Sequence, residues 1–208
     1  MTISKCAFVF VFAAAFAVTG TARASDQSNL IARATRVAAH MKSDPAFGAA
    51  QNMLRNARAV FIVPSLVKGG FIFGAEGGNG VLLRRTGPNS WSSPAFCAMG
   101  SASFGLQIGL QKAEIVMLIM SDRALRGIQH DQFKIGAGAG ITAITLSSGA
   151  EGATSGRGGD IVVWTSGTGA YGGLTFNGSV IKADDDENAA PLPARDTAAL
   201  RHNLATVW

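Results

Sequence analysis

Apolar residues near the start of the chain recur at helical spacing. Between positions 30 and 41 they fall on one face of a helix, while Arg33 and Arg36 lie on another. The Asp44-Pro45 pair ends this pattern because proline does not continue a helix. A second short helix is predicted over positions 47–57. We expect both helices to cover a sheet with their apolar faces, although a basic face of this kind also suits an anionic membrane surface.

From position 59 the pattern changes to short apolar runs separated by glycine, which is typical of strands. The predicted strands are 60–63, 71–73, 81–83, 104–110, 115–120, 133–146, 161–165 and 170–181. A short helix from Ser121 to Gln129 and a Gly/Ser/Thr loop over 147–159 interrupt them. Because few helices separate the strands, the pattern favours an α+β fold in which N-terminal helices pack on a glycine-rich, mainly antiparallel sheet that is curved or barrel-like.

The C-terminal part contains a run of four acidic residues at 184–187 and a helix predicted from Asp196 to Val207. We interpret the acidic run as a solvated turn, since charge runs usually face solvent. Binding of Ca²⁺ is the alternative, but the spacing of an EF-hand loop is absent. We expect residues 191–208 to form an appendage that packs on the sheet.

The first 24 residues have the pattern of a secretory signal peptide. A short positive start precedes an apolar run over 6–20, and Ala22-Arg23-Ala24 forms a small-x-small cleavage site. The run is shorter than the roughly 20 apolar residues of a membrane-spanning helix. We therefore predict cleavage after Ala24, a domain over 25–190, and localisation in a bacterial periplasm or in a membrane-associated envelope.

Composition narrows the class of protein further. The chain has 208 residues, of which 48% are hydrophobic and 15% charged, so one folded domain is favoured over disorder. Removal of residues 1–24 takes away Lys5, Arg23 and no acid, which lowers the net charge from +5 to +3. This charge permits an anionic partner without requiring nucleic acid. Cys97 is then the one remaining cysteine, so no internal disulfide forms, and its apolar neighbours predict a buried thiol.

The sequence carries no strong signature of catalysis or of a cofactor. The G-x-G-x-x-G spacing over 167–172 continues into a strand-like pattern, whereas a dinucleotide site needs a helix there. No phosphate-binding loop or nucleophile elbow is present. The three histidines lie in separate predicted helices and not at metal-ligand spacing. We expect no enzyme activity, cofactor or metal, with a Cys97 nucleophile as the open alternative.

The segment 59–109 contains several sequence motifs in a specific order. These motifs are Pro64, Lys68-Gly69-Gly70-Phe71, Gly78, Gly80, Arg84-Arg85, Trp91-Ser92, Pro94, Phe96 and Ser103 to Gly109. The segment resembles the SYLF domain family, which occurs in bacterial exported proteins and in eukaryotic membrane-trafficking proteins. The resemblance extends to about Asn188. The chain departs from the family at Gly138-Ala139-Gly140, where a Gly-Pro pair is common, and at Ala189-Ala190-Pro191, where the family often has an aromatic-Tyr-Gly ending.

The resemblance implies binding of phospholipid head groups, with phosphoinositides as ligands of eukaryotic members and other anionic lipids for an exported member. The candidate lipid-binding residues are Lys68, Arg84, Arg85, Arg33, Arg36 and Trp91. We expect Lys68 in a glycine-rich turn and the two adjacent arginines beside a turn at Gly87-Pro88. Ordinary surface charge is the alternative for the basic residues, and core packing is the alternative for Trp91.

Together these features predict a non-enzymatic exported protein that recognises anionic phospholipid head groups or a membrane surface. The basic residues at sheet turns would hold the head groups, and the amphipathic N-terminal helix would assist. The alternative is a structural or interaction protein that binds a protein partner in the cell envelope. Nucleic acid is not an expected partner.

Overall fold

The computed structural model describes residues 9–48, 51–70, 73–104, 109–129, 133–134, 143–147, 159–168, 179–192 and 194–206. Its helices are α1 (Val9–Ser43), α2 (Pro45–Gly48), α3 (Gln51–Asn56), α4 (Asp122–Gln129), α5 (Asp185–Ala189) and α6 (Ala194–Ala205). Its strands are β1 (Ala59–Gly70), β2 (Phe73–Gly87), β3 (Ser90–Trp91), β4 (Ala95–Phe104), β5 (Gly109–Ile119), β6 (Phe133–Lys134), β7 (Ala143–Ser147), β8 (Ile161–Thr168) and β9 (Val180–Ala183).

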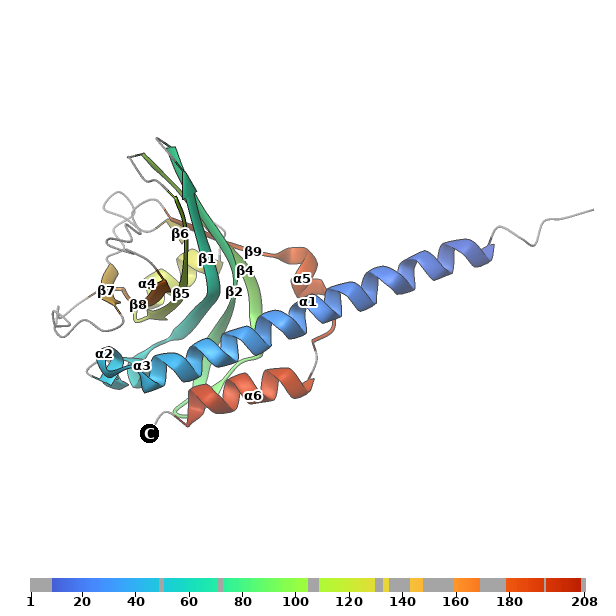
Figure 1. Cartoon of the computed structure of the whole chain (residues 1–208). Helices are drawn as coiled ribbons and strands as arrows, with labels where there is room; N and C mark the ends of the chain where they lie inside the picture. Colours follow the sequence, from blue (N-terminus) through green and yellow to red (C-terminus); the bar gives the residue numbers. More distant parts are fainter. Residues whose placement is uncertain are drawn as a thin grey trace, which may run out of the picture.

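The strands form one twisted sheet in the order β6-β9-β4-β2-β1-β5-β8-β7, with β3 paired to β2. The pairs are antiparallel except for β7 and β8, which run parallel. No described strand joins the two ends of this order, so the described sheet is open. Figure 1 shows the long strands β1 and β2 bending across the molecule, with α1 and α6 side by side on one face. The predicted α+β class is therefore confirmed.

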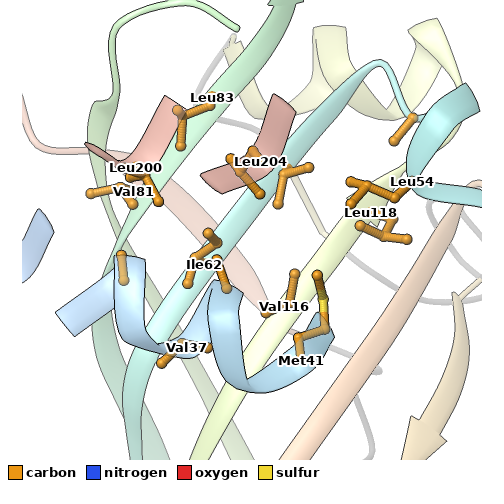
Figure 2. Close-up of a cluster of buried hydrophobic side chains, with 14 of the residues drawn as sticks. Val37, Met41, Leu54, Ile62, Val81, Leu83, Val116, Leu118, Leu200 and Leu204 are labelled. Carbon is orange, nitrogen blue, oxygen red and sulfur yellow. The ribbon is translucent and has the colours of Figure 1, made fainter. Parts of the chain in front are cut away.

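Alternating side chains give the sheet two apolar faces. On β1, Val60 and Ile62 point towards α1, and Phe61 and Val63 point to the other side. The first face, which we call the helix-covered face, packs under α1, α3 and α6 (Figure 2). The opposite face packs against α4 through buried side chains of that helix. Because helices pack on both faces of the sheet, successive strand residues are apolar whichever face they point to. The strands therefore form nearly continuous apolar runs in the sequence.

A β-bulge bends β1 at its middle. The register with β5 shifts between Val63 and Leu66, at the position of Pro64, which has no backbone N–H to donate to the ladder. Neighbouring β2 meets this bend with Gly78 and Gly80. A Cβ atom at Gly80 would lie 2.5 Å from the carbonyl oxygen of Ile62 and 2.8 Å from a ring carbon of Phe61. Glycine is therefore required for the close approach of these two strands.

Helix α1 packs on the sheet through an apolar stripe in its C-terminal part. Its most N-terminal buried residue among those with described side chains is Gln27, followed by the apolar stripe Ile31, Ala34, Val37, Ala38 and Met41. This stripe confirms the amphipathic pattern predicted for 30–41. Figure 1 shows the N-terminal part of α1 projecting away from the sheet. Within the described residues, no helix is both long enough and apolar enough to cross a membrane.

The acidic run and the C-terminal segment both form helices. The prediction of a turn at 184–187 is wrong, because Asp184 caps α5 by accepting the backbone N–H of Glu187 at 3.1 Å. Acidic residues in a first helical turn also interact favourably with the helix dipole. Helix α6 packs mainly on α1 and on β3, with Leu200 and Leu204 buried in the core under the helix-covered face.

Other boundaries differ from the predicted ones. The strands extend beyond their apolar runs, because small residues also take part in the ladder: residues 100–103 of β4 pair with residues 74–77 of β2. The predicted strand over 104–110 is divided between the end of β4 and the start of β5. Most of the loop predicted over 147–159 and most of the strands predicted over 133–146 and 170–181 lie outside the described residues.

Candidate anion-binding groove along helix α1

A groove runs between α1 and the helix-covered face of the sheet, beside the bulge of β1. Its volume is about 380 Å³, and Arg33, His40, Ser65, Lys112 and Ser166 are among the residues that line it. We call it the α1 groove. The bulge at Pro64 presents Ser65 to it, and the strand alternation of β5 places Lys112 and Glu114 on the same face as the buried Val116. Helix, bulge and strand thus bring basic and hydroxyl side chains together.

The charges in the α1 groove are only partly paired. The Nδ1 atom of His40 lies 2.6 Å from Oε2 of Glu114, so the one carboxylate among the lining residues is already engaged. Arg33 and Lys112 are exposed and have no ion-pair partner in the part of the chain that the structure describes. Two unpaired cations beside two serine hydroxyls form an environment that favours an anion such as a phosphate group.

Arg36 lies one turn further along α1 and is also exposed. It lines a second and larger hollow further towards the N-terminus of α1, which shares Arg33 and Ser65 with the α1 groove. Of the six residues predicted to bind lipid, Arg33 and Arg36 are therefore the two that the structure brings to one surface.

Lys68 does not lie in a turn, so this expectation is wrong. It belongs to β1, directly opposite Glu76 of β2 in the antiparallel register, and only 8% of its surface is exposed. Glu76 is equally buried and accepts a hydrogen bond from the Ser101 hydroxyl at 2.6 Å. The glycines next to Lys68 belong to the strand, because β1 extends to Gly70 and β2 begins at Phe73. An opposite charge on the neighbouring strand stabilises a lysine in this position.

Arg85 and Trp91 form one structural unit. The guanidinium of Arg85 stacks over the indole of Trp91, with its central carbon 4.2 Å from the ring centroid. It also donates hydrogen bonds to the carbonyl oxygens of Ala57 at 2.8 Å, Pro88 at 2.6 Å and Leu54 at 2.5 Å. Partial burial lowers the pKa of Arg85 from its ordinary value. Trp91 is 1% exposed, so the structure places it in the core and not at the surface.

Arg84 is exposed and points to the face opposite α1, since strand neighbours alternate. It pairs in register with Ala59 at the start of β1, whereas Lys68 lies nine residues further along that strand. At the usual rise of a strand this separates them by roughly 30 Å. The basic residues predicted at sheet turns therefore occupy two ends of the sheet and do not form one site.

Sequence reasoning missed Lys112, Ser65 and Ser166, which come from three different strands. A signal for Lys112 was present, because it alternates in step with the apolar residues of β5 that face α1. The contribution of Ser65 depends on the bulge, which shifts the alternation of β1 by one residue. Only the register of the folded sheet shows that these side chains meet.

The comparisons with known proteins agree with the resemblance seen in the sequence. Residues 100–197 match the family model described as Ysc84, "Las17-binding protein actin regulator". This match covers just under half of the chain, and it confirms the resemblance to the SYLF family. No solved structure matches the chain.

Relatives in fungi and animals match this chain over part of their own length. LAS seventeen-binding protein 3 of Saccharomyces cerevisiae is 26% identical over 153 residues, which make up 70% of this chain and 33% of that protein. Protein YSC84 of the same yeast is 28% identical over 149 residues, or 68% of this chain and 32% of that protein. SH3 domain-containing YSC84-like protein 1 of Mus musculus is 26% identical over 121 residues, or 57% of this chain and 36% of that protein. The chain thus spans about a third of the length of these relatives.

Proposed function

We propose that this protein is a non-enzymatic lipid-binding protein that holds anionic phospholipid head groups in the α1 groove. The observation that carries the proposal is the presence of Arg33 and Lys112, both exposed and without an ion-pair partner among the described residues, beside Ser65 and Ser166. A head-group phosphate carries charge that two such cations neutralise, and hydroxyl groups donate to its oxygens. Arg36 adds a further positive charge to the same helix.

Electrostatic attraction to a membrane surface acts over short distances in salt. Each basic residue near an anionic surface contributes about 1 kcal/mol, and this attraction falls off within a Debye length. Arg33, Arg36 and Lys112 lie on one side of the molecule, where α1 covers the sheet, and can therefore act together. Arg85 and Trp91 stack on each other inside the fold and Lys68 is buried in β1, so these residues support the domain and do not contact lipid in this proposal.

We further propose that the protein is exported, with cleavage after Ala24, and works in the periplasm or at the envelope membrane. The apolar run over 6–20 and the small residues around Arg23 support this proposal. The apolar stripe of α1 that packs on the sheet, Ile31 to Met41, lies beyond the expected cleavage site.

Co-sedimentation with vesicles tests the lipid-binding proposal. The protein is mixed with vesicles of phosphatidylcholine alone and with vesicles that contain phosphatidylglycerol, at low and high salt. We expect binding to the anionic vesicles only, with a marked decrease at high salt because counterions screen the head groups. Equal binding to both kinds of vesicle, unaffected by salt, would contradict an electrostatic head-group site.

A protein partner is the second candidate function. The name of the relative LAS seventeen-binding protein 3 describes binding to another protein, and the exposed basic residues of α1 are equally suited to an acidic protein surface. In this case a stoichiometric protein would co-purify from an envelope extract, and the same protein would show no preference among vesicles.

A further inference from the structure

A histidine and a glutamate meet in the wall of the α1 groove. His40 belongs to the last turn of α1, and Glu114 faces it from β5. The Nδ1 atom of His40 lies 2.6 Å from Oε2 of Glu114. The two side chains keep 46% and 35% of their surface exposed, so both remain in contact with solvent and accessible to a ligand in the groove. The site therefore contains a titratable pair.

The geometry of this contact determines which ring nitrogen of His40 takes up a proton. An ionised carboxylate only accepts hydrogen bonds, so Nδ1 carries a hydrogen and donates it to Glu114. In the neutral ring the other nitrogen, Nε2, then carries no hydrogen. Protonation at Nε2 converts the ring to an imidazolium and leaves the bond to Glu114 in place. The bond then becomes a charge-assisted hydrogen bond, which is stronger than the neutral one.

The fold holds the imidazole ring at this position. The rings of His40 and Trp164 form a T-shaped pair with a centroid distance of 5.3 Å. The ring of His40 thus contacts β5 through Glu114 and β8 through Trp164. Because both contacts come from the sheet, a change in the charge of His40 acts at the groove and not at a distant surface.

Among the described residues, the charged groups that face this pair are basic. Arg33 comes from α1 and lines the same groove, and Arg36 lies one helical turn before His40. Lys112 comes from β5, on the same face of the strand. Strand β8 contributes the uncharged hydroxyl of Ser166. Helix α2 and strand β7, which pack near this end of α1, contain no charged residue.

Two further charged groups at this end of α1 do not line the groove. The Nζ atom of Lys42 donates hydrogen bonds to the backbone and side-chain oxygens of Asn203 on α6, at 3.0 and 3.1 Å. The buried carboxylate of Asp44 accepts the indole N–H of Trp164 at 2.9 Å. Each of these groups has its own partner, so the charge of the groove depends on the side chains that line it.

Protonation of His40 doubles the net positive charge of the groove. With a neutral ring, two cations and one carboxylate leave a net charge of +1, and an imidazolium raises it to +2. Histidine is the side chain that changes its charge between about pH 5 and 8. Carboxylates, lysine and arginine ordinarily keep their charge across this range. The charge offered to an anion therefore increases as the medium becomes mildly acid.

We propose that the pair of His40 and Glu114 makes anion binding in the α1 groove sensitive to pH, with tighter binding in a mildly acid medium. At higher pH the carboxylate of Glu114 stands beside a neutral ring and repels the phosphate of a head group. At lower pH the imidazolium offsets this negative charge, so Arg33 and Lys112 attract the phosphate unopposed. This inference rests on the proposed function, since it concerns the regulation of the same site.

Sedimentation with vesicles at two pH values tests the inference. The full-length protein is mixed with vesicles that contain phosphatidylglycerol, at about pH 5.5 and about pH 8 and at the same low ionic strength. The phosphodiester of this lipid keeps its negative charge at both values, so the vesicle surface does not change. We expect the affinity at the lower pH to be about fivefold higher, which is the effect of one positive charge near an anionic surface. Circular dichroism at each pH checks that the protein remains folded.

Substitutions of two histidines identify the titrating group. His40→Gln keeps a hydrogen-bond donor for Glu114 but takes up no proton, so its affinity at both pH values should equal that of the wild type at the higher pH. His202→Gln is the matched control, since His202 is exposed on α6 and does not line the groove, and it should keep the full pH dependence. Glu114→Gln removes the repelling carboxylate and should bind more tightly than the wild type at the higher pH.

Failure of this inference and failure of the proposed function give different results. Equal affinity of the wild type at both pH values, with salt-sensitive binding to anionic vesicles, would overturn the pH control and leave the proposed function intact. A pH dependence that survives in His40→Gln, or that is lost in His202→Gln, would assign the titration to another group and also overturn the inference. Absence of binding to anionic vesicles at either pH would contradict both.

Discussion

The indole Nε1–H of Trp164 on β8 donates a hydrogen bond to Oδ2 of Asp44 at 2.9 Å, and both residues are buried. Asp44 lies between α1 and α2, where its backbone also bonds to Met41 and Phe47. The rings of Trp164 and His40 form a T-shaped pair with a centroid distance of 5.3 Å. This contact attaches the C-terminal end of α1 to the sheet and so holds one wall of the α1 groove.

Removal of the hydrogen-bond acceptor at Asp44 should destabilise the folded protein. Asp44→Ala leaves the indole N–H without its partner in a buried position, which should lower the free energy of unfolding by about 1–3 kcal/mol. Asp44→Asn keeps an acceptor oxygen of similar size and should lose less. Urea unfolding followed by fluorescence measures both variants. An Asp44→Ala protein as stable as the wild type would show that this bond does not hold α1 in place.

The two adjacent arginines of β2 should behave differently. Arg85→Ala removes three hydrogen bonds to carbonyl oxygens and the stack on Trp91, and should destabilise the protein by about 2–4 kcal/mol. Arg84→Ala removes an exposed side chain and should change stability by less than about 0.5 kcal/mol. Thermal or urea unfolding of both proteins tests this. Equal effects of the two substitutions would contradict the structural role of Arg85.

Glycine substitutions in β2 test the close approach at the bulge. A Cβ at Gly80 would meet a backbone oxygen and the ring of Phe61 closer than 3 Å, so Gly80→Ala should cost about 2–4 kcal/mol or prevent folding. At Gly77 the nearest atom would be the carbonyl oxygen of Met99 at 3.6 Å, which is an ordinary contact. Gly77→Ala should therefore be neutral or slightly stabilising, because it lowers the entropy of the unfolded chain. The reverse order of stability would contradict the described register of β1 and β2.

The export proposal predicts the mass of the mature protein. If the chain is secreted by an expressing bacterium, the protein recovered from the periplasm should begin at Ser25, as measured by intact mass spectrometry. Ala24→Leu should block cleavage, since the site requires small residues. Recovery of an uncleaved chain from the cytoplasm alone would contradict the export proposal.

Much of the fold follows from local pattern. The apolar residues of α1 repeat at helical spacing and pack on the sheet. The apolar runs of β1, β5 and β8 identify the central strands. The thiol of Cys97 is buried, as its neighbours indicate. These features are local because each depends on side chains within one element.

The site depends on information that one segment does not contain. Lys68 sits among glycines that are typical of a turn, but pairing with Glu76 extends the strand through them. Trp91 has the chemistry of an interfacial residue, yet the stack with Arg85 and the cover of α6 bury it. The α1 groove needs the bulge of β1 and the register of β5. Such long-range pairing is set by the whole sheet and overrides local preference.

Charge reversal in the α1 groove tests the central claim most directly. Arg33→Glu/Lys112→Glu is compared with Arg84→Glu/Arg126→Glu, which reverses two exposed arginines on the other side of the sheet. Both proteins are sedimented with vesicles that contain phosphatidylglycerol, after their cooperative melting has been checked. The account predicts that the groove variant loses at least about tenfold in vesicle affinity, whereas the control stays within about threefold of the wild type. Equal losses in the two variants, or a loss in the control alone, would contradict a head-group site in the α1 groove.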